Sequence, residues 1–132
     1  MNEPARRKIL VVDDDEITLE VTRERLQGAG FLVLTHSNAL GTSVLIAREK
    51  PDFVLLDVRM PGLSGDRLAK LLSKGNFRPR VILHSACERA ELGSLAMRCG
   101  AAGIIEKTDD DEYFLKQLEN CIGVAKLVQD VS

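Results

Sequence analysis

Five polar residues could together act on a phosphoryl group: Asp13, Asp14, Asp57, Ser85 and Lys107. Each of them follows or interrupts a short apolar run. Carboxylates that share a crevice repel one another and raise their own pKa values unless a cation is present. A hard divalent ion such as Mg²⁺, which takes a few carboxylates and keeps several waters, resolves that conflict. The ammonium and the hydroxyl would then suit the phosphoryl oxygens.

Asp57 is the best candidate for the residue that accepts the phosphoryl group. It stands alone in the apolar run 53–58, where an unpaired charge would be costly without a functional partner. Carboxylates can act as nucleophiles and form an aspartyl phosphate. Asp13 and Asp14 stand side by side and have the character of metal ligands, direct or through water. We expect Asp15 to cap the following helix instead.

The positions of these residues depend on a predicted parallel sheet. Short apolar runs alternate with longer amphipathic segments, which is typical of a βαβ architecture. Continuous apolar runs are typical of strands that are buried on both faces. Because the carboxyl ends of parallel strands meet at one crevice, the five polar side chains should converge there. The expected strands are residues 9–12, 31–35, 53–58, 81–85 and 103–106.

Five amphipathic helices are expected between and after these strands, each with an inward face at helical spacing. The third should begin near Ser64 and end at Gly75, and the last should begin in the acidic run 109–112. The inward faces, in chain order, are Leu19, Thr22, Leu26 and Ala29; Leu40, Val44 and Ala47; Leu68, Leu71 and Leu72; Leu92, Leu95, Ala96 and Cys99; and Phe114, Leu118, Ile122 and Ala125.

Length and composition fit one globular domain over residues 1–132, with a core at about 8–128 and a tail or start of a linker at 123–132. A net charge of −2 leaves no broad positive field for direct nucleic-acid binding. The sequence has no apolar run long enough for a membrane span and no secretory signal, so we expect a cytoplasmic protein. The three cysteines are odd in number and lack CxxC spacing, which argues against a disulfide framework or a zinc site.

Several stretches resemble the signature positions of response-regulator receiver domains, and the resemblance extends from about Lys8 to Val128. They are Val11-Val12-Asp13-Asp14, Leu56-Asp57-Val58-Arg59-Met60-Pro61-Gly62, the pair Ser85-Ala86, and Lys107. The resemblance implies a doubly wound (βα)5 flavodoxin-like sandwich, with strand order 2-1-3-4-5 and helices on both faces of the sheet.

The same resemblance implies a two-component signalling switch. A histidine kinase or phosphotransfer domain would pass a phosphoryl group to Asp57 with Mg²⁺, and the backbone carbonyl of Arg59 would join Asp13, Asp14 and Asp57 as a metal ligand. Ser85 would relay the change to the face formed by the fourth helix, fifth strand and fifth helix, which would control a downstream effector or a fused output domain. The chain would catalyse only its own phosphorylation and dephosphorylation.

Four positions depart from the family pattern or leave a role open. Thr108 follows Lys107 where the family usually has a cis-proline, so the loop is either trans and slightly displaced or strained. Ile104 stands where many receivers carry a relay aromatic. The Arg59 side chain could reach a carboxylate or the phosphoryl group, or lie in solvent. Cys87 is small and uncharged, which would alter access of the hydrolytic water.

The sequence also leaves other functional assignments open. A pseudo-receiver, a phosphorylation-independent interaction module, would keep the fold, and Ile104 and Thr108 are its best support. A flavin carrier would need a first loop without three acids, and a phosphatase of this architecture would need an acid where Arg59 stands. Pairing through the fourth-helix to fifth-helix face is undecided, as is whether the chain is a complete regulator or the receiver of a longer protein. We expect His84 to be a hydrogen-bonded core histidine.

Overall fold

The computed structural model describes residues 6–63, 67, 70, 71 and 77–123. Five parallel strands form one sheet in the order β2-β1-β3-β4-β5, as the resemblance implies. The strands are β1 (Lys8–Val12), β2 (Leu32–His36), β3 (Phe53–Asp57), β4 (Arg80–Ser85) and β5 (Gly103–Glu106). The helices with described bounds are α1 (Glu16–Gly28), α2 (Thr42–Glu49), α4 (Arg89–Cys99) and α5 (Asp111–Ile122).

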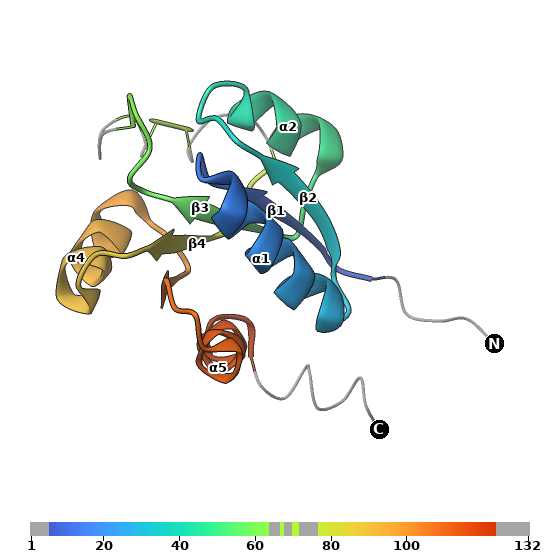
Figure 1. Ribbon diagram of the computed structural model, residues 1–132. Coiled ribbons are helices and arrows are strands. Elements are labelled where there is room, and N and C mark those ends of the chain that lie inside the picture. Colours follow the sequence, from blue (N-terminus) through green and yellow to red (C-terminus); the bar gives the residue numbers. More distant parts are fainter. Residues whose placement is uncertain (1–5, 64–66, 68–69, 72–76, 124–132) are drawn as a thin grey trace.

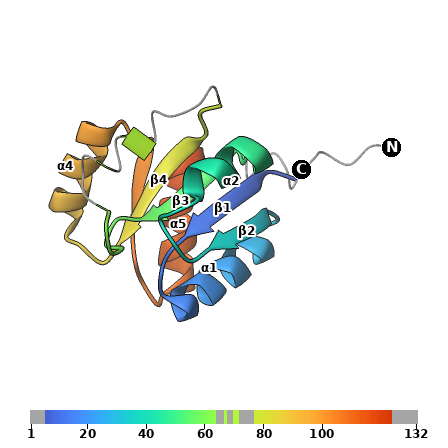
Figure 2. The ribbon, with the colours of Figure 1, turned by 90° about the horizontal axis from the view of Figure 1, so that it is seen from above.

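The sheet is the middle layer of a three-layer sandwich, with α1 and α5 on one face and α2 and α4 on the other (Figures 1 and 2). Alternate side chains of β1 enter opposite layers: Ile9 and Val11 pack with α1 and α5, and Leu10 and Val12 pack with α2 and α4. A strand covered on both faces has no solvent side, which is why its sequence is apolar throughout.

Two helix starts match their sequence signals. The Asp15 side chain accepts a hydrogen bond from the Ile17 N–H at the start of α1, so the predicted cap is confirmed. Asp110 caps α5 in the same way, within the predicted acidic run. The predicted inward face of α1 is confirmed, since Leu19, Thr22 and Leu26 are buried.

The predicted inward face of the second helix is wrong. Leu40 is 81% exposed and Val44 is 65% exposed, whereas Thr42 and Ile46 are the buried residues of α2. The helix begins only after Gly41, whose φ of 86° turns the chain, and this sets the helix in a different rotation. Thr42 can lie inside because its hydroxyl donates to the Asn38 carbonyl oxygen at 3.2 Å.

Smaller differences concern element ends and the third helix. Most of the predicted third helix, with Ser64, Leu68, Leu72 and Gly75, lies outside the described residues, as does Ala125 at the end of the predicted fifth helix. The described part of α5 ends at Ile122, and Gly123 follows with a φ of 96°. The observed strand ends lie within one residue of the predicted ones.

Candidate functional site

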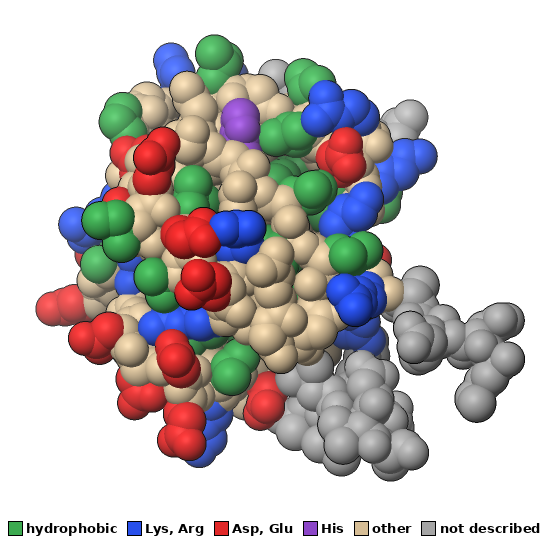
Figure 3. Space-filling model, turned by 45° about the vertical axis from the view of Figure 1, so that its right-hand side comes forward, with side chains coloured by type: hydrophobic (Ala, Val, Ile, Leu, Met, Phe, Trp, Pro, Cys, Tyr) green, Lys and Arg blue, Asp and Glu red, His purple; other side chains and the backbone are tan. Residues whose placement is uncertain are grey.

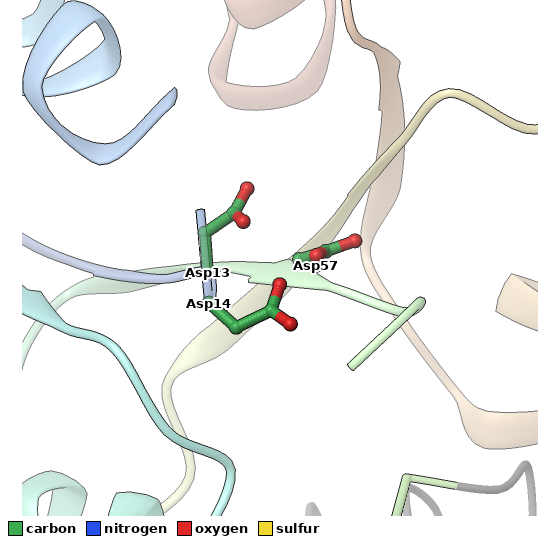
Figure 4. Close-up of side chains that lie close together, drawn as sticks. All are labelled: Asp13, Asp14 and Asp57. Carbon is green, nitrogen blue, oxygen red and sulfur yellow. The ribbon is translucent and has the colours of Figure 1, made fainter. Parts of the chain in front are cut away.

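Three carboxylates meet at the carboxyl edge of the sheet, as predicted. The register pairs Val12 of β1 with Leu56 of β3, so Asp13 and Asp57 leave neighbouring strands side by side. Asp13, Asp14 and Asp57 each offer an oxygen, and these oxygens lie within 4.8 Å of one another. Figure 4 shows the three side chains projecting from the ends of these two strands. The topology therefore unites residues that lie more than forty positions apart in the sequence.

Asp57 is only 3% exposed, although it carries a carboxyl group. Its Oδ1 accepts a hydrogen bond from the Arg59 backbone N–H at 3.0 Å. Burial raises the pKa of Asp57 above its usual value, and the nearby negative charge of Asp13 adds to the rise. The Arg59 N–H and the Lys107 ammonium oppose it without reversing it. The site thus holds a carboxylate whose charge is poorly compensated by protein groups alone.

Lys107 brings a cation to these carboxylates. Its Nζ lies 2.9 Å from Asp13 Oδ2 and 3.6 Å from Asp57 Oδ2. Burial would lower the pKa of Lys107, but the two carboxylates outweigh it and raise that pKa. No peptide bond among the described residues is cis, so the Lys107–Thr108 bond is trans. Of the two open alternatives, the loop is therefore trans, and the ammonium still reaches the acidic cluster.

The donor set fits a magnesium ion. Mg²⁺ prefers hard oxygen ligands and is usually held by one or two carboxylates while it keeps several waters. Asp13, Asp14 and Asp57 offer three such oxygens within 4.8 Å of one another. Asp13 Oδ2 is fully buried and, among the described residues, has no hydrogen-bond donor in good geometry; its close neighbour is the Lys107 ammonium. An oxygen in that position is available to a cation. The Arg59 backbone carbonyl stays a predicted ligand.

Ser85 lies at the end of β4, fully buried, next to this cluster in the sheet. Its hydroxyl is 2.9 Å from Cys87 Sγ and accepts a hydrogen bond from the Cys87 backbone N–H at 3.2 Å. The exposed Arg59 side chain also contacts this thiol, with Nε 3.2 Å from Sγ. The guanidinium therefore contacts a neighbouring sulfur rather than a carboxylate, and Cys87 links the loops after β3 and β4.

His84 lies in the core as predicted, at 2% exposure, with its ring edge-on to Phe114. Its Nε2 is buried and has no hydrogen-bond partner among the described residues. Burial, together with the positive charge of Lys107, lowers the pKa of His84 to about 4. The ring is neutral at pH 7, which is the state that an apolar layer tolerates without an ion pair.

A polar cluster behind Lys107 was not predicted. Glu106 Oε1 accepts a hydrogen bond from the Tyr113 hydroxyl at 3.0 Å and lies 3.3 Å from Arg89 Nη1. The buried Gln117 side chain bonds the backbone of Glu106. A sequence signal existed, since Gln117 interrupts the apolar face of α5 beside Leu118. A buried amide must be hydrogen-bonded, so its position alone indicates a specific partner.

The surface is charged without one dominant sign. In the view of Figure 3, basic side chains are interspersed with acidic ones, and acidic side chains gather on the left of this face. Cys87 is buried and Cys99 and Cys121 are partly buried, all with free thiols. No described helix is both long and apolar enough to cross a bilayer.

Comparison with known proteins decides the family. The model of the response regulator receiver domain matches residues 9–119. The chain belongs to this family. The response regulator GacA of Pseudomonas aeruginosa is 34% identical over 102 residues, which cover 76% of this chain and 48% of GacA. The C4-dicarboxylate transport transcriptional regulatory protein DctD of the same species is 30% identical over 124 residues, covering 94% of this chain and 27% of DctD.

Solved structures agree on the fold of this receiver domain. The chemotaxis protein CheY4 of Vibrio cholerae has a TM-score of 0.78 at 22% identity and covers 89% of this chain and 99% of its own. A response regulator from Thermotoga maritima has a TM-score of 0.75 at 25% identity, with 89% and 98% covered. The receiver thus matches whole solved chains, while it spans less than half the length of the two curated relatives above.

Proposed function

We propose that this receiver domain is a phosphoacceptor switch of a two-component system and that Asp57 accepts the phosphoryl group. One observation carries the proposal: a buried carboxylate lies beside two further carboxylates and a lysine ammonium at the carboxyl edge of the sheet. An ion-pair network built for stability alone would balance its charges, whereas this cluster has three acids around one base.

The reaction is a transfer between two nucleophiles. An ionised oxygen of Asp57 attacks the phosphorus of a phosphohistidine; the new P–O bond forms as the P–N bond breaks, and the imidazole keeps the electron pair. Lys107 would hold one phosphoryl oxygen by charge, and the Ser85 hydroxyl would donate to another. For this donation the hydroxyl proton must point toward the phosphoryl group and not toward Cys87 Sγ, which lies 2.9 Å from the Ser85 oxygen. Water later cleaves the acyl phosphate and returns the carboxylate.

Asp13, Asp14 and Asp57, with the Arg59 backbone carbonyl, would hold Mg²⁺. When bound, the ion supplies positive charge to the transferring phosphoryl group and offsets the repulsion among the carboxylates. Burial and Asp13 raise the pKa of Asp57, so a cation at this position also favours the ionised form that attacks.

The partners follow from this role. We propose a histidine kinase or phosphotransfer domain as donor, and an effector or fused output domain as receiver of the signal, acting in the cytoplasm. The output surface would be the α4–β5–α5 face, which is also where a homodimer would form. We propose no direct contact with nucleic acid by this domain, given the net charge of −2. We propose that the domain catalyses only its own phosphorylation and dephosphorylation.

One experiment tests the phosphoacceptor directly. The protein is incubated with Mg²⁺ and acetyl phosphate, and intact mass spectrometry counts added phosphoryl groups. Wild type and Asp109→Asn, a control that removes an exposed carboxylate, should each gain one group. Asp57→Asn should gain none, and hydroxylamine should remove the group from wild type because the linkage is an acyl phosphate.

Two results would contradict the proposal. An unchanged adduct on Asp57→Asn would place the phosphate elsewhere. No adduct on wild type, with either Mg²⁺ or Mn²⁺, would favour the pseudo-receiver reading instead.

A further inference from the structure

The peptide unit between Glu106 and Lys107 is held from both sides. Its N–H, on Lys107, donates to the Ser85 backbone oxygen at 2.8 Å. Its carbonyl oxygen, on Glu106, accepts from Gln117 Nε2 at 3.1 Å. Gln117 Oε1 in turn accepts from the Glu106 N–H at 2.8 Å. One side chain of α5 thus pairs with the free edge of β5, directly before the lysine.

The Gln117 amide is buried, so it must find its hydrogen-bond partners within the protein. Gln117 is 4% exposed, in the layer that α5 forms with the sheet. β5 is the last strand of the sheet and pairs on one side with β4, so its other edge lacks a strand partner. Gln117 replaces that partner at Glu106, and Cys121 Sγ donates to the Ile104 carbonyl oxygen at 3.5 Å further along the same edge. An edge strand held by one neighbour is easily displaced, and the amide bonds it at the residue where displacement would move Lys107.

We propose that Gln117 is a positioning residue for Lys107, an inference that rests on the phosphoacceptor function proposed above. The amide fixes the backbone from which the lysine side chain extends, and so sets the distance of its Nζ from Asp13 and Asp57. No other described side chain hydrogen-bonds the Glu106–Lys107 peptide. The trans peptide after Lys107 leads into a loop that is exposed from Asp109 onward, whereas the peptide before the lysine is hydrogen-bonded on both sides.

The removal of the amide should affect Lys107 and the carboxylates differently. Gln117→Leu keeps a buried side chain of similar size and deletes both hydrogen bonds to Glu106, together with the weaker one that Arg89 Nη1 donates to Gln117 Oε1 at 3.4 Å. With Lys107 misplaced, phosphoryl uptake from acetyl phosphate should slow about ten- to a hundredfold, as expected for ångström-scale misplacement of a reacting group. Mg²⁺ affinity should stay or tighten several-fold, because the ammonium then competes less for Asp13 Oδ2, 2.9 Å away.

The decisive measurement is a double-mutant cycle with Lys107→Ala. If Gln117 acts through Lys107, Gln117→Leu should slow uptake in the wild-type background and have no further effect when Lys107 is absent. Gln27→Leu, the same change at an exposed glutamine of α1, is the matched control and should leave the rate unchanged. Gln117→Glu keeps the acceptor for the Glu106 N–H and should retain part of the rate. Circular dichroism melts establish that each variant is folded at the assay temperature.

Three results would overturn the positioning role: a rate for Gln117→Leu equal to that of Gln27→Leu, an equal slowing with and without Lys107, or Mg²⁺ affinity that weakens in step with the rate. If Gln117→Leu does not fold, the same cycle with Gln117→Glu decides. If wild type takes up no phosphoryl group, the proposed function fails. The Mg²⁺ titration of the same variants, read by calorimetry, then still tests whether Gln117 holds Lys107 against Asp13.

Discussion

Asp57→Asn is expected to stabilise the metal-free fold while it abolishes phosphorylation. Asparagine has the same shape, and its amide oxygen can still accept the Arg59 N–H at the 3.0 Å that Asp57 Oδ1 occupies. The substitution removes the negative charge of Asp57, a residue that is 3% exposed and shares its site with two other carboxylates. A phosphoacceptor that costs stability would show that the site is arranged for function at the expense of the fold.

The magnitude follows from the distances. At 4.8 Å and an effective dielectric constant of about 20, each carboxylate pair repels by about 3 kcal/mol. Lys107 Nζ, 3.6 Å from Asp57 Oδ2, attracts it by about 5 kcal/mol on the same scale. Asp14 is exposed and more strongly screened, so repulsion and attraction nearly cancel and the cost of burying the charge remains. We expect a gain of about 1 to 2 kcal/mol in unfolding free energy, or about 3 to 8 °C in Tm.

The pH dependence has a definite sign. Because the pKa of Asp57 is raised in the fold, the native protein holds this proton to higher pH than the unfolded chain does. The favourable contribution is complete below the ordinary aspartate pKa of about 4 and is lost as pH rises through the raised value. Above that range the wild-type fold bears the full free-energy cost of burying the ionised Asp57 carboxylate, and the Asp57→Asn fold does not. The Tm difference between Asp57→Asn and wild type should therefore increase as the pH rises.

Thermal melts in EDTA and in Mg²⁺ are the assay, with Asp109→Asn as the control for loss of one exposed negative charge. At a Mg²⁺ concentration about 100 times the dissociation constant, wild type should gain about 2.7 kcal/mol, and Asp57→Asn much less. The reasoning is refuted if Asp57→Asn melts below the control in EDTA, or if Mg²⁺ stabilises it as much as wild type.

Two further predictions concern β5 and α5. A Cβ at Gly103 would lie 2.7 Å from Cys121 Sγ, so Gly103→Ala should cost about 1 to 3 kcal/mol in urea unfolding. The cost should fall in a Cys121→Ala background, and Gly28→Ala, which meets no atom within 4 Å, should not destabilise; equal costs at the two glycines would contradict the close approach. Tyr113 is the one tyrosine of a chain without tryptophan, and its hydroxyl donates to Glu106, next to the proposed lysine of the site. If phosphorylation by acetyl phosphate with Mg²⁺ moves Glu106 away from Tyr113, the tyrosine emission should rise, because a carboxylate that accepts the phenol hydrogen bond quenches it. Unchanged emission in fully phosphorylated protein would exclude movement at this contact.

The sequence by itself determines most of the scaffold and the acidic part of the site. Apolar runs such as residues 9–12 predict strands buried on both faces, and the topology rule for parallel sheets then brings Asp13 and Asp57 together. The prediction succeeds because it needs only the ends of strands, which turns and polar residues mark in the sequence. Asp15 is predictable for the same reason, since its cap is local.

Only the tertiary structure decides the contacts that depend on helix rotation and on side-chain direction. Val44 and Thr42 lie on the same short helix, and their exposure is the reverse of what hydrophobicity indicates, because the turn at Gly41 sets the rotation and Asn38 satisfies the buried hydroxyl. Gln117 reads in the sequence as a polar interruption of an apolar face. Its meaning comes from the free edge of β5, which lies eleven residues away along the chain and needs a hydrogen-bond partner inside the protein.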